Sequence, residues 1–127
     1  MMHWLIMLRE YLDEILDGTK FYDARAYNTN KRGLIALVDT KKSAIIVTVE
    51  LIGTKHITAE EYCKWHATGK RAGMVFHVED DDSVFYAYDF INPRRLARPI
   101  KITKTGRVWT AIDDSVKKEF IFQQRLF

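Results

Sequence analysis

The length, composition and charge of this chain restrict the classes of protein to which it can belong. It has 127 residues, 47% of them apolar, and a net charge of +3. That length suits a single domain over residues 1–127 and excludes two domains of ordinary size.

The apolar run "HWLIML" is far shorter than the roughly 18 residues of a membrane span, and it has no basic leader. The one cysteine, Cys63, cannot form an internal disulfide. We therefore expect a soluble, cytoplasmic protein with no membrane partner.

The basic residues are segregated from the acidic ones along the chain. The acidic residues concentrate in Glu79–Asp82 and in the expected helices, whereas the basic residues recur as neighbouring pairs. Such segregation can make one face of a weakly basic protein positive, as a nucleic-acid ligand requires. The pairs are Lys31–Arg32, Lys41–Lys42, Lys70–Arg71, Arg94–Arg95 and Lys117–Lys118.

The first half of the chain predicts a strand, a helix and then extended segments. The apolar run "WLIML" is typical of a short buried strand. From Leu8 to Leu16 the apolar residues follow helical spacing, and Gly18 stands where a left-handed helix end is expected. Extended segments follow at "KFYDARAY", "LIALV" and "SAIIVTVELIGT", whose β-branched residues favour a sheet.

The second half predicts one more helix and several strands. Thr58 and Glu61 have the spacing of a capping box, which indicates a short helix through about His66. A glycine-flanked basic loop, Gly69–Gly73, precedes strands at "MVFHV", "SVFYAYDF", "PIKIT" and "RVWTAI". The end, "DDSVKKEFIFQQRLF", fits a capped helix or a last strand. Taken together, these expected helices and strands predict an α+β fold that is mainly β. It would be a small closed or half-open β-barrel of about six strands with two or three short helices.

The segment "GTKFYDAR" carries three charges in a stretch that is otherwise half-buried. Asp23 and Arg25 point to one face of a strand because side chains alternate, whereas Lys20 joins them only from the turn after Gly18. If they converge, Asp23 and Arg25 can pair, and Arg25 offers a planar donor fork to a phosphate or a base edge. Desolvation could also make Lys20 a general base. The alternative is a solvated strand with an exposed ion pair worth about 0.5 kcal/mol.

The same segment resembles the ASCH domain, a relative of the PUA domains that bind RNA. "ILDGTKFYDAR" is similar to the family's pattern of an apolar helix end, a glycine, a lysine, an acid and an arginine, here Gly18, Lys20, Asp23 and Arg25. "YAYDF" followed by "RPIKITKTGRVWTAI" resembles the family's closing strands. The resemblance implies a PUA-like β-barrel with a cleft between barrel and helices. It also implies binding of RNA or modified nucleosides, and two activities, hydrolysis of acetylcytidine and of RNA.

The residues expected in the cleft favour binding over hydrolysis. In the acetylcytidine amidohydrolases of the family, the matching lysine acts with a threonine and a glutamate. The resemblance places Asp23 at the threonine and Lys70 near the glutamate. Because Lys70 and Arg71 replace an acid, we expect a more negative ligand, RNA or a nucleotide. A hydrolase acting on RNA or on an acylated nucleoside is the first alternative, and a protein-interaction module with a degenerate pocket is the second.

Three residues are candidates for catalysis: Lys20, Asp23 and His66. His66 could act as a general acid or base, or could simply favour the end of a helix through its charge. The candidate ligand-binding residues are Arg25, Tyr22, Lys70, Arg71 and Tyr88, and Tyr86 and Trp65 could also stack on a base. Cys63 and His66 lack the further ligands of a zinc site, so we expect no metal and no other cofactor.

Overall fold

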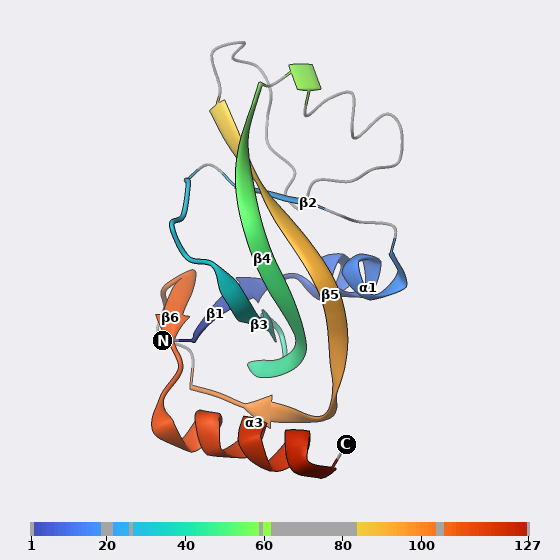
Figure 1. Cartoon of the computed structure of the whole chain (residues 1–127), viewed down its shortest axis with the longest axis vertical. Helices are drawn as coiled ribbons and strands as arrows, with labels where there is room; N and C mark the ends of the chain where they lie inside the picture. The colour runs from blue at the N-terminus through green and yellow to red at the C-terminus, as the bar shows by residue number, and fades with distance from the viewer. Residues whose placement is uncertain are drawn as a thin grey trace.

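The computed structural model describes residues 2–18, 22–25, 27–58, 60–61, 84–103 and 106–126, and its six strands and two helices follow the chain order shown in Figure 1. The first half contains β1 (His3–Met7), α1 (Arg9–Asp17), β2 (Tyr22–Arg25), β3 (Gly33–Asp39) and β4 (Ala44–Thr58). The second half contains β5 (Val84–Lys101), β6 (Trp109–Ala111) and α3 (Asp114–Leu126). The expected strand "MVFHV" and the basic loop Gly69–Gly73 lie outside the described residues.

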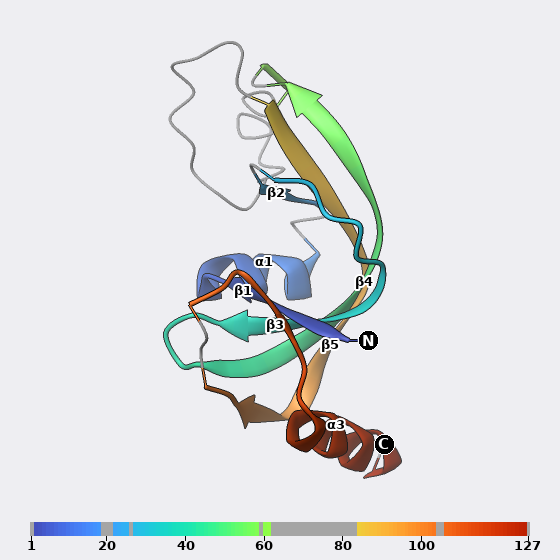
Figure 2. The same cartoon turned by 90° about the vertical axis from the view of Figure 1, so that its left-hand side faces the viewer.

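The strands form one sheet in the order β2-β5-β4-β3-β1-β6. Strands β1 and β3 are parallel, and the other neighbouring strands are antiparallel. The sheet is strongly curved, and α1 lies on its concave side (Figure 2). The predicted α+β fold, mainly β with six strands, is confirmed.

The alternation of side chains along the strands builds a separate core on each face of the sheet. On β1, Leu5 faces the concave side with α1, whereas Trp4 faces α3 on the other side. The concave core contains Leu5, Leu12, Ile15, Ile35, Leu37, Val47, Val49, Leu51, Tyr88 and Phe90 among its members. The core beneath α3 contains Trp4, Ala36, Val38, Ile45, Ile100, Val116 and Phe120. Each helix therefore covers one face, and the sheet is a shared wall.

Both helix ends that the structure describes in detail have clear local causes. Gly18 adopts a φ of 83° as the left-handed end of α1, as its position predicts. The last segment, for which helix and strand were both open, is the helix α3. Its cap is Asp113, whose Oδ1 accepts the Val116 N–H at 3.0 Å. Residues 60 and 61 are helical, and the Glu61 N–H donates to Thr58 Oγ1 at 3.1 Å, but the remainder of that expected helix lies outside the described residues.

The prediction of two strands between residues 83 and 103 is wrong, because β5 runs unbroken from Val84 to Lys101. Its two prolines would interrupt a regular ladder, since proline has no N–H to donate. Pro93 instead lies between Ile91 and Arg94, where the pairing with β4 shifts register. Pro99 lies in the corresponding shift between Arg95 and Ile100. Bulges thus let one long strand pass two residues that sequence patterns treat as strand ends.

The sheet is not closed, which corrects the closed form of the predicted barrel. Within the described ranges the edge strands β2 and β6 do not pair with each other. Side-chain contacts instead connect each edge strand with a strand next to the opposite edge. Arg25 Nη2 on β2 donates to the Ile6 carbonyl of β1 at 3.0 Å, and the ring of Tyr88 on β5 lies 6.1 Å from that of Trp109 on β6. We call this set of contacts, made by Arg25, Tyr88, Ile6 and Trp109, the seam.

Candidate functional site

Asp23 and Arg25 form a largely buried ion pair at the seam. Both lie on β2, opposite Tyr88 and Tyr86 of β5, and they share a face because they are two residues apart. Arg25 Nε donates to Asp23 Oδ2 at 2.5 Å, and the exposed fractions of the two side chains are 13% and 0%. A second N–H of the same guanidinium donates to the Ile6 carbonyl. The pair therefore ties β2 to β1 and holds Arg25 in one orientation.

Tyr88 is the cross-strand neighbour of Asp23 on β5 and is itself buried. Its hydroxyl donates to the Tyr27 carbonyl at 2.5 Å, and its ring packs between those of Phe90 and Trp109. Burial raises the pKa of Tyr88 above its ordinary value of 10.0, and the nearby Arg25 opposes that rise. The tyrosine that the sequence predicts to bind a ligand thus supports the loop that follows β2.

That loop, residues 27–32, is held in shape by its own hydrogen bonds. The Asn28 side-chain oxygen accepts the Thr29 N–H at 2.8 Å, and Thr29 Oγ1 accepts the Lys31 N–H at 3.2 Å. Arg32 donates back to the carbonyls of Thr29 at 3.0 Å and Lys31 at 2.7 Å. Such local bonds restrict the backbone before any ligand arrives. The backbone at Lys31 is therefore restricted.

Lys31 and Trp109 stand at the boundary between two open pockets. The Lys31 Nζ atom lies 5.2 Å from the centroid of the Trp109 ring, within range of a cation–π interaction. The larger pocket has a volume of about 610 Å³ and the smaller one about 340 Å³, both within the range of small-molecule sites, about 300–1,000 Å³. The described lining of the larger pocket is His3, Lys31, Arg107, Trp109, Thr110 and Ala111. That of the smaller pocket is Asn28, Thr29, Asn30, Lys31 and Trp109.

The charge of the larger pocket has one sign. Lys31 and Arg107 supply positive charge to its lining. None of the described residues that line this pocket is acidic. A concave surface lined by cations and one indole suits an anion that also carries a planar or apolar group.

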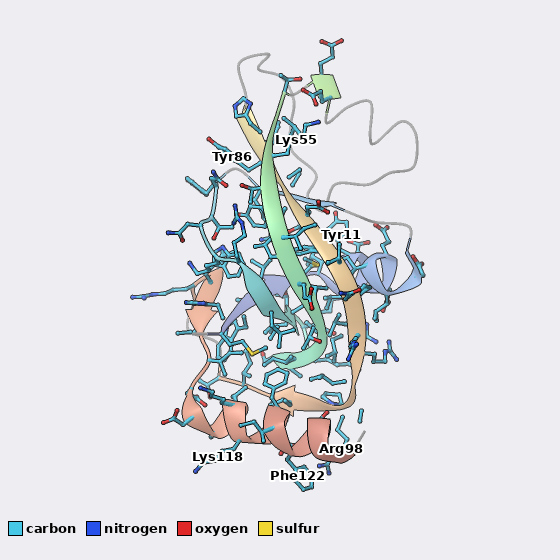
Figure 3. The ribbon with its side chains drawn as sticks, viewed as in Figure 1. Tyr11, Lys55, Tyr86, Arg98, Lys118 and Phe122 are labelled. Carbon is cyan, nitrogen blue, oxygen red and sulfur yellow. The ribbon has the colours of Figure 1, made fainter. Side chains whose placement is uncertain are left out.

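The structure describes only some of the residues predicted for the site. Five of them lie outside the described residues: Lys20, Trp65, His66, Lys70 and Arg71. The backbone of Tyr22 belongs to β2 and pairs with Asp89 of β5. Asp23, Arg25 and Tyr88 are brought together at the seam. Tyr86 lies away from α3 (Figure 3), opposite His56 of β4, and the centroids of the two rings are 5.6 Å apart.

Sequence patterns missed the residues that line the two pockets. Lys31 is visible in the sequence as half of a basic pair, and Trp109 as the tryptophan of the closing strand that resembles the ASCH pattern. Nothing in the sequence places them side by side, because 77 residues lie between them along the chain. The two residues meet only in the folded structure.

In the part of the chain that the structure describes, no group of three or more His, Cys, Asp or Glu side chains could hold a metal ion. No helix among those residues is long and apolar enough to cross a membrane.

The architecture defines the class of fold: a small, mainly β, α+β fold with an open, curved six-stranded sheet. Solved structures of similar shape include ASCH domains. The ASCH protein of Zymomonas mobilis has a TM-score of 0.71 at 12% identity, over 95% of this chain and 94% of that one. A variant of that protein with one tyrosine replaced by phenylalanine has a TM-score of 0.72 at 12% identity, over 95% and 96%.

A second kind of neighbour is the N-terminal domain of McrB from Staphylothermus marinus, with a TM-score of 0.61 at 11% identity, over 92% of this chain and 91% of that one. No family model and no curated protein matches the sequence. The ASCH resemblance seen in the sequence is thus confirmed as a likeness of fold, and identities this low say nothing more than fold.

Proposed function

We propose that this domain binds RNA or a nucleotide at the surface around Lys31 and Trp109, beside the seam. The observation that carries the proposal is the pair of pockets that share these two residues, the larger of which has cationic side chains and no acidic one among its described lining. Lysine and arginine contacts to phosphate supply affinity for any nucleic acid, whatever its sequence. The positive charge of the larger pocket and the concave shape of both pockets therefore support the same class of ligand, RNA or a nucleotide.

The residues predicted from the sequence extend this surface in the proposal. Arg25 lies at the seam with its guanidinium fixed by Asp23, and Lys20 follows α1 shortly before it in the chain. Lys70 and Arg71 would add positive charge, His66 would border the same cleft, and Tyr22 would contribute its ring. Each of these assignments is a prediction to be tested by substitution.

Binding is proposed ahead of hydrolysis because of the state of Asp23. Its carboxylate is fully buried and accepts a hydrogen bond from Arg25. A buried, paired carboxylate orients its partner well, but it is poorly placed to exchange protons with a substrate. The role that we propose for Asp23 is to position Arg25.

The test is RNA binding measured by fluorescence anisotropy over a series of salt concentrations. With a short single-stranded RNA we expect log K to fall linearly with log salt, by about 0.7 for each phosphate contacted. Lys31→Ala should weaken binding and make the slope shallower by about that amount. Lys42→Ala is the matched control, since Lys42 is exposed in the turn between β3 and β4 and lines neither pocket.

Two results would contradict the proposal. One is the absence of binding at low salt, or binding that does not change with salt. The other is equal behaviour of the Lys31 and Lys42 variants, which would mean that the RNA contacts another surface.

A further inference from the structure

The two pockets that meet at Lys31 and Trp109 have different chemistry. The larger one presents the cationic side chains of Lys31 and Arg107. The smaller one adds no further charge to the shared Lys31, and its other polar groups are the amides of Asn28 and Asn30 and the hydroxyl of Thr29. A ligand that fills both would have a charged part and a neutral, hydrogen-bonding part.

The smaller pocket has groups that match the edge of a nucleobase. The Asn28 side-chain oxygen already accepts the Thr29 N–H at 2.8 Å, so this side chain can offer a ligand its amide N–H groups. Asn30 is exposed and has both a donor and an acceptor on one planar amide. A planar amide can pair with a base edge through two hydrogen bonds, which fixes the orientation of the base.

The positive charge of Lys31 lies between these two environments. Its ammonium group is 5.2 Å from the centroid of the Trp109 ring, and both residues line both pockets. The loop that carries it is held by the bond from Tyr88 to the Tyr27 carbonyl. A phosphate beside Lys31 would be within the larger pocket, whose lining also includes Arg107, and a base attached through its sugar would extend toward the smaller pocket.

We propose, building on the function proposed above, that the site takes one phosphorylated nucleotide unit. Its phosphate contacts Lys31 and Arg107 in the larger pocket, and its base edge contacts Asn28 and Asn30 in the smaller one. A free nucleoside monophosphate and one nucleotide of an RNA strand share this chemistry. The experiment therefore has to distinguish a free nucleotide from RNA as the ligand, and the contribution of one pocket from that of the other.

The experiment is a calorimetric titration at low salt with the four ribonucleosides, their 5′-monophosphates, inorganic phosphate and a short single-stranded RNA. We expect at least one monophosphate to bind about tenfold or more tightly than its nucleoside, because contacts between ions are the stronger ones. Arg107→Gln should remove most of that advantage and leave the nucleoside affinity unchanged. Asn30→Ala should weaken nucleoside and monophosphate by the same factor.

The control variant is Arg94→Gln, since Arg94 is an exposed arginine of β5 that lines neither pocket, and it should bind like the parent protein. Circular dichroism confirms that each variant is folded. If the variants behave as expected and the oligonucleotide binds more tightly than any monophosphate, the natural ligand is one nucleotide of an RNA strand. If the oligonucleotide and the best monophosphate bind with equal affinity, the natural ligand is a free nucleotide.

Three outcomes would overturn the inference. They are equal binding of nucleosides and monophosphates, loss of nucleoside affinity in Arg107→Gln, and binding of inorganic phosphate as tightly as of any nucleotide. If RNA binds with the expected salt dependence but ignores Arg107 and Asn30, the inference fails and the proposed function stands. If neither RNA nor any nucleotide binds, the proposed function fails first, and the inference fails with it.

Discussion

Tyr88 links the buried sheet to the loop that carries Lys31. Its hydroxyl donates to the Tyr27 carbonyl at 2.5 Å, and its ring packs against Trp109. Tyr88→Phe removes that hydrogen bond and keeps the ring. We expect a loss of about 1 kcal/mol in the free energy of unfolding, and weaker RNA binding because the loop is less restricted.

Tyr88 should also make the free energy of unfolding depend on pH in the alkaline range. Burial raises the pKa of Tyr88 above 10.0, so its contribution to stability is complete below about pH 10 and is lost as the pH rises through the raised pKa. The phenylalanine variant should lack this part of the alkaline loss. Urea unfolding of both proteins at about pH 8 and about pH 11 measures the difference. An identical loss of stability in the two proteins would mean that Tyr88 is not the titrating group.

Asp39 makes the corresponding prediction on the acid side. Burial by itself would raise its pKa, but the N–H groups of Lys41 and Lys42 and the guanidinium of Arg9 hold it below its ordinary value of 3.8. Its contribution is therefore present above about pH 4 and is lost as the pH falls through the lowered pKa. Asp39→Asn should cost about 1–3 kcal/mol at neutral pH and flatten the acid limb of the stability curve.

Asp13→Asn is the control for that measurement, because Asp13 also pairs with Arg9 but its side chain is 52% exposed. Its effect should be about 0.5 kcal/mol. Equal losses in the two variants would show that the buried position of Asp39 is not what makes it important.

At the scale of elements, α3 is held by one face. Phe120 is 6% exposed in the core beneath the helix, whereas Phe122 is 49% exposed and lies on the outer side, near Arg98 (Figure 3). Phe120→Ala should lower the free energy of unfolding by about 3–5 kcal/mol through lost burial and the cavity that remains.

Phe122→Ala is the matched control on the same helix. Its ring centroid lies 5.9 Å from the Arg98 guanidinium carbon, an exposed cation–π contact worth about 0.5–1 kcal/mol. Denaturant melts of both variants give the comparison. A large loss for Phe122 and a small one for Phe120 would place the wrong face of α3 against the sheet.

The elements also show how far sequence patterns reach. Helical spacing up to Gly18 predicts α1, and β-branched runs predict β3 and β4, because these signals are local. The single strand β5 was predicted as two, since Pro99 breaks a strand pattern unless a bulge accommodates it. The final segment was ambiguous because β-branched and aromatic residues follow a good helix cap, and the packing of Val116 and Phe120 decides for the helix.

At the scale of the whole molecule, the candidate site depends on curvature. Alternation along β2 predicts that Asp23 and Arg25 share a face, and they pair. The meeting of Lys31 with Trp109 requires the edges of the six-stranded sheet to approach each other, and sequence patterns contain no measure of that. The part of the site fixed by neighbouring residues was predictable, and the part made by distant strands was not.

The most direct test of binding beside the seam is the indole N–H resonance of Trp109. The chain has 3 tryptophans, so an ¹⁵N-labelled sample gives few indole signals, and Trp109→Phe assigns the one of interest. Addition of a short single-stranded RNA or a nucleotide should shift the Trp109 signal and leave that of Trp4, which is 4% exposed beneath α3, nearly unchanged. Binding that moves the Trp4 signal but not the Trp109 signal would contradict the account.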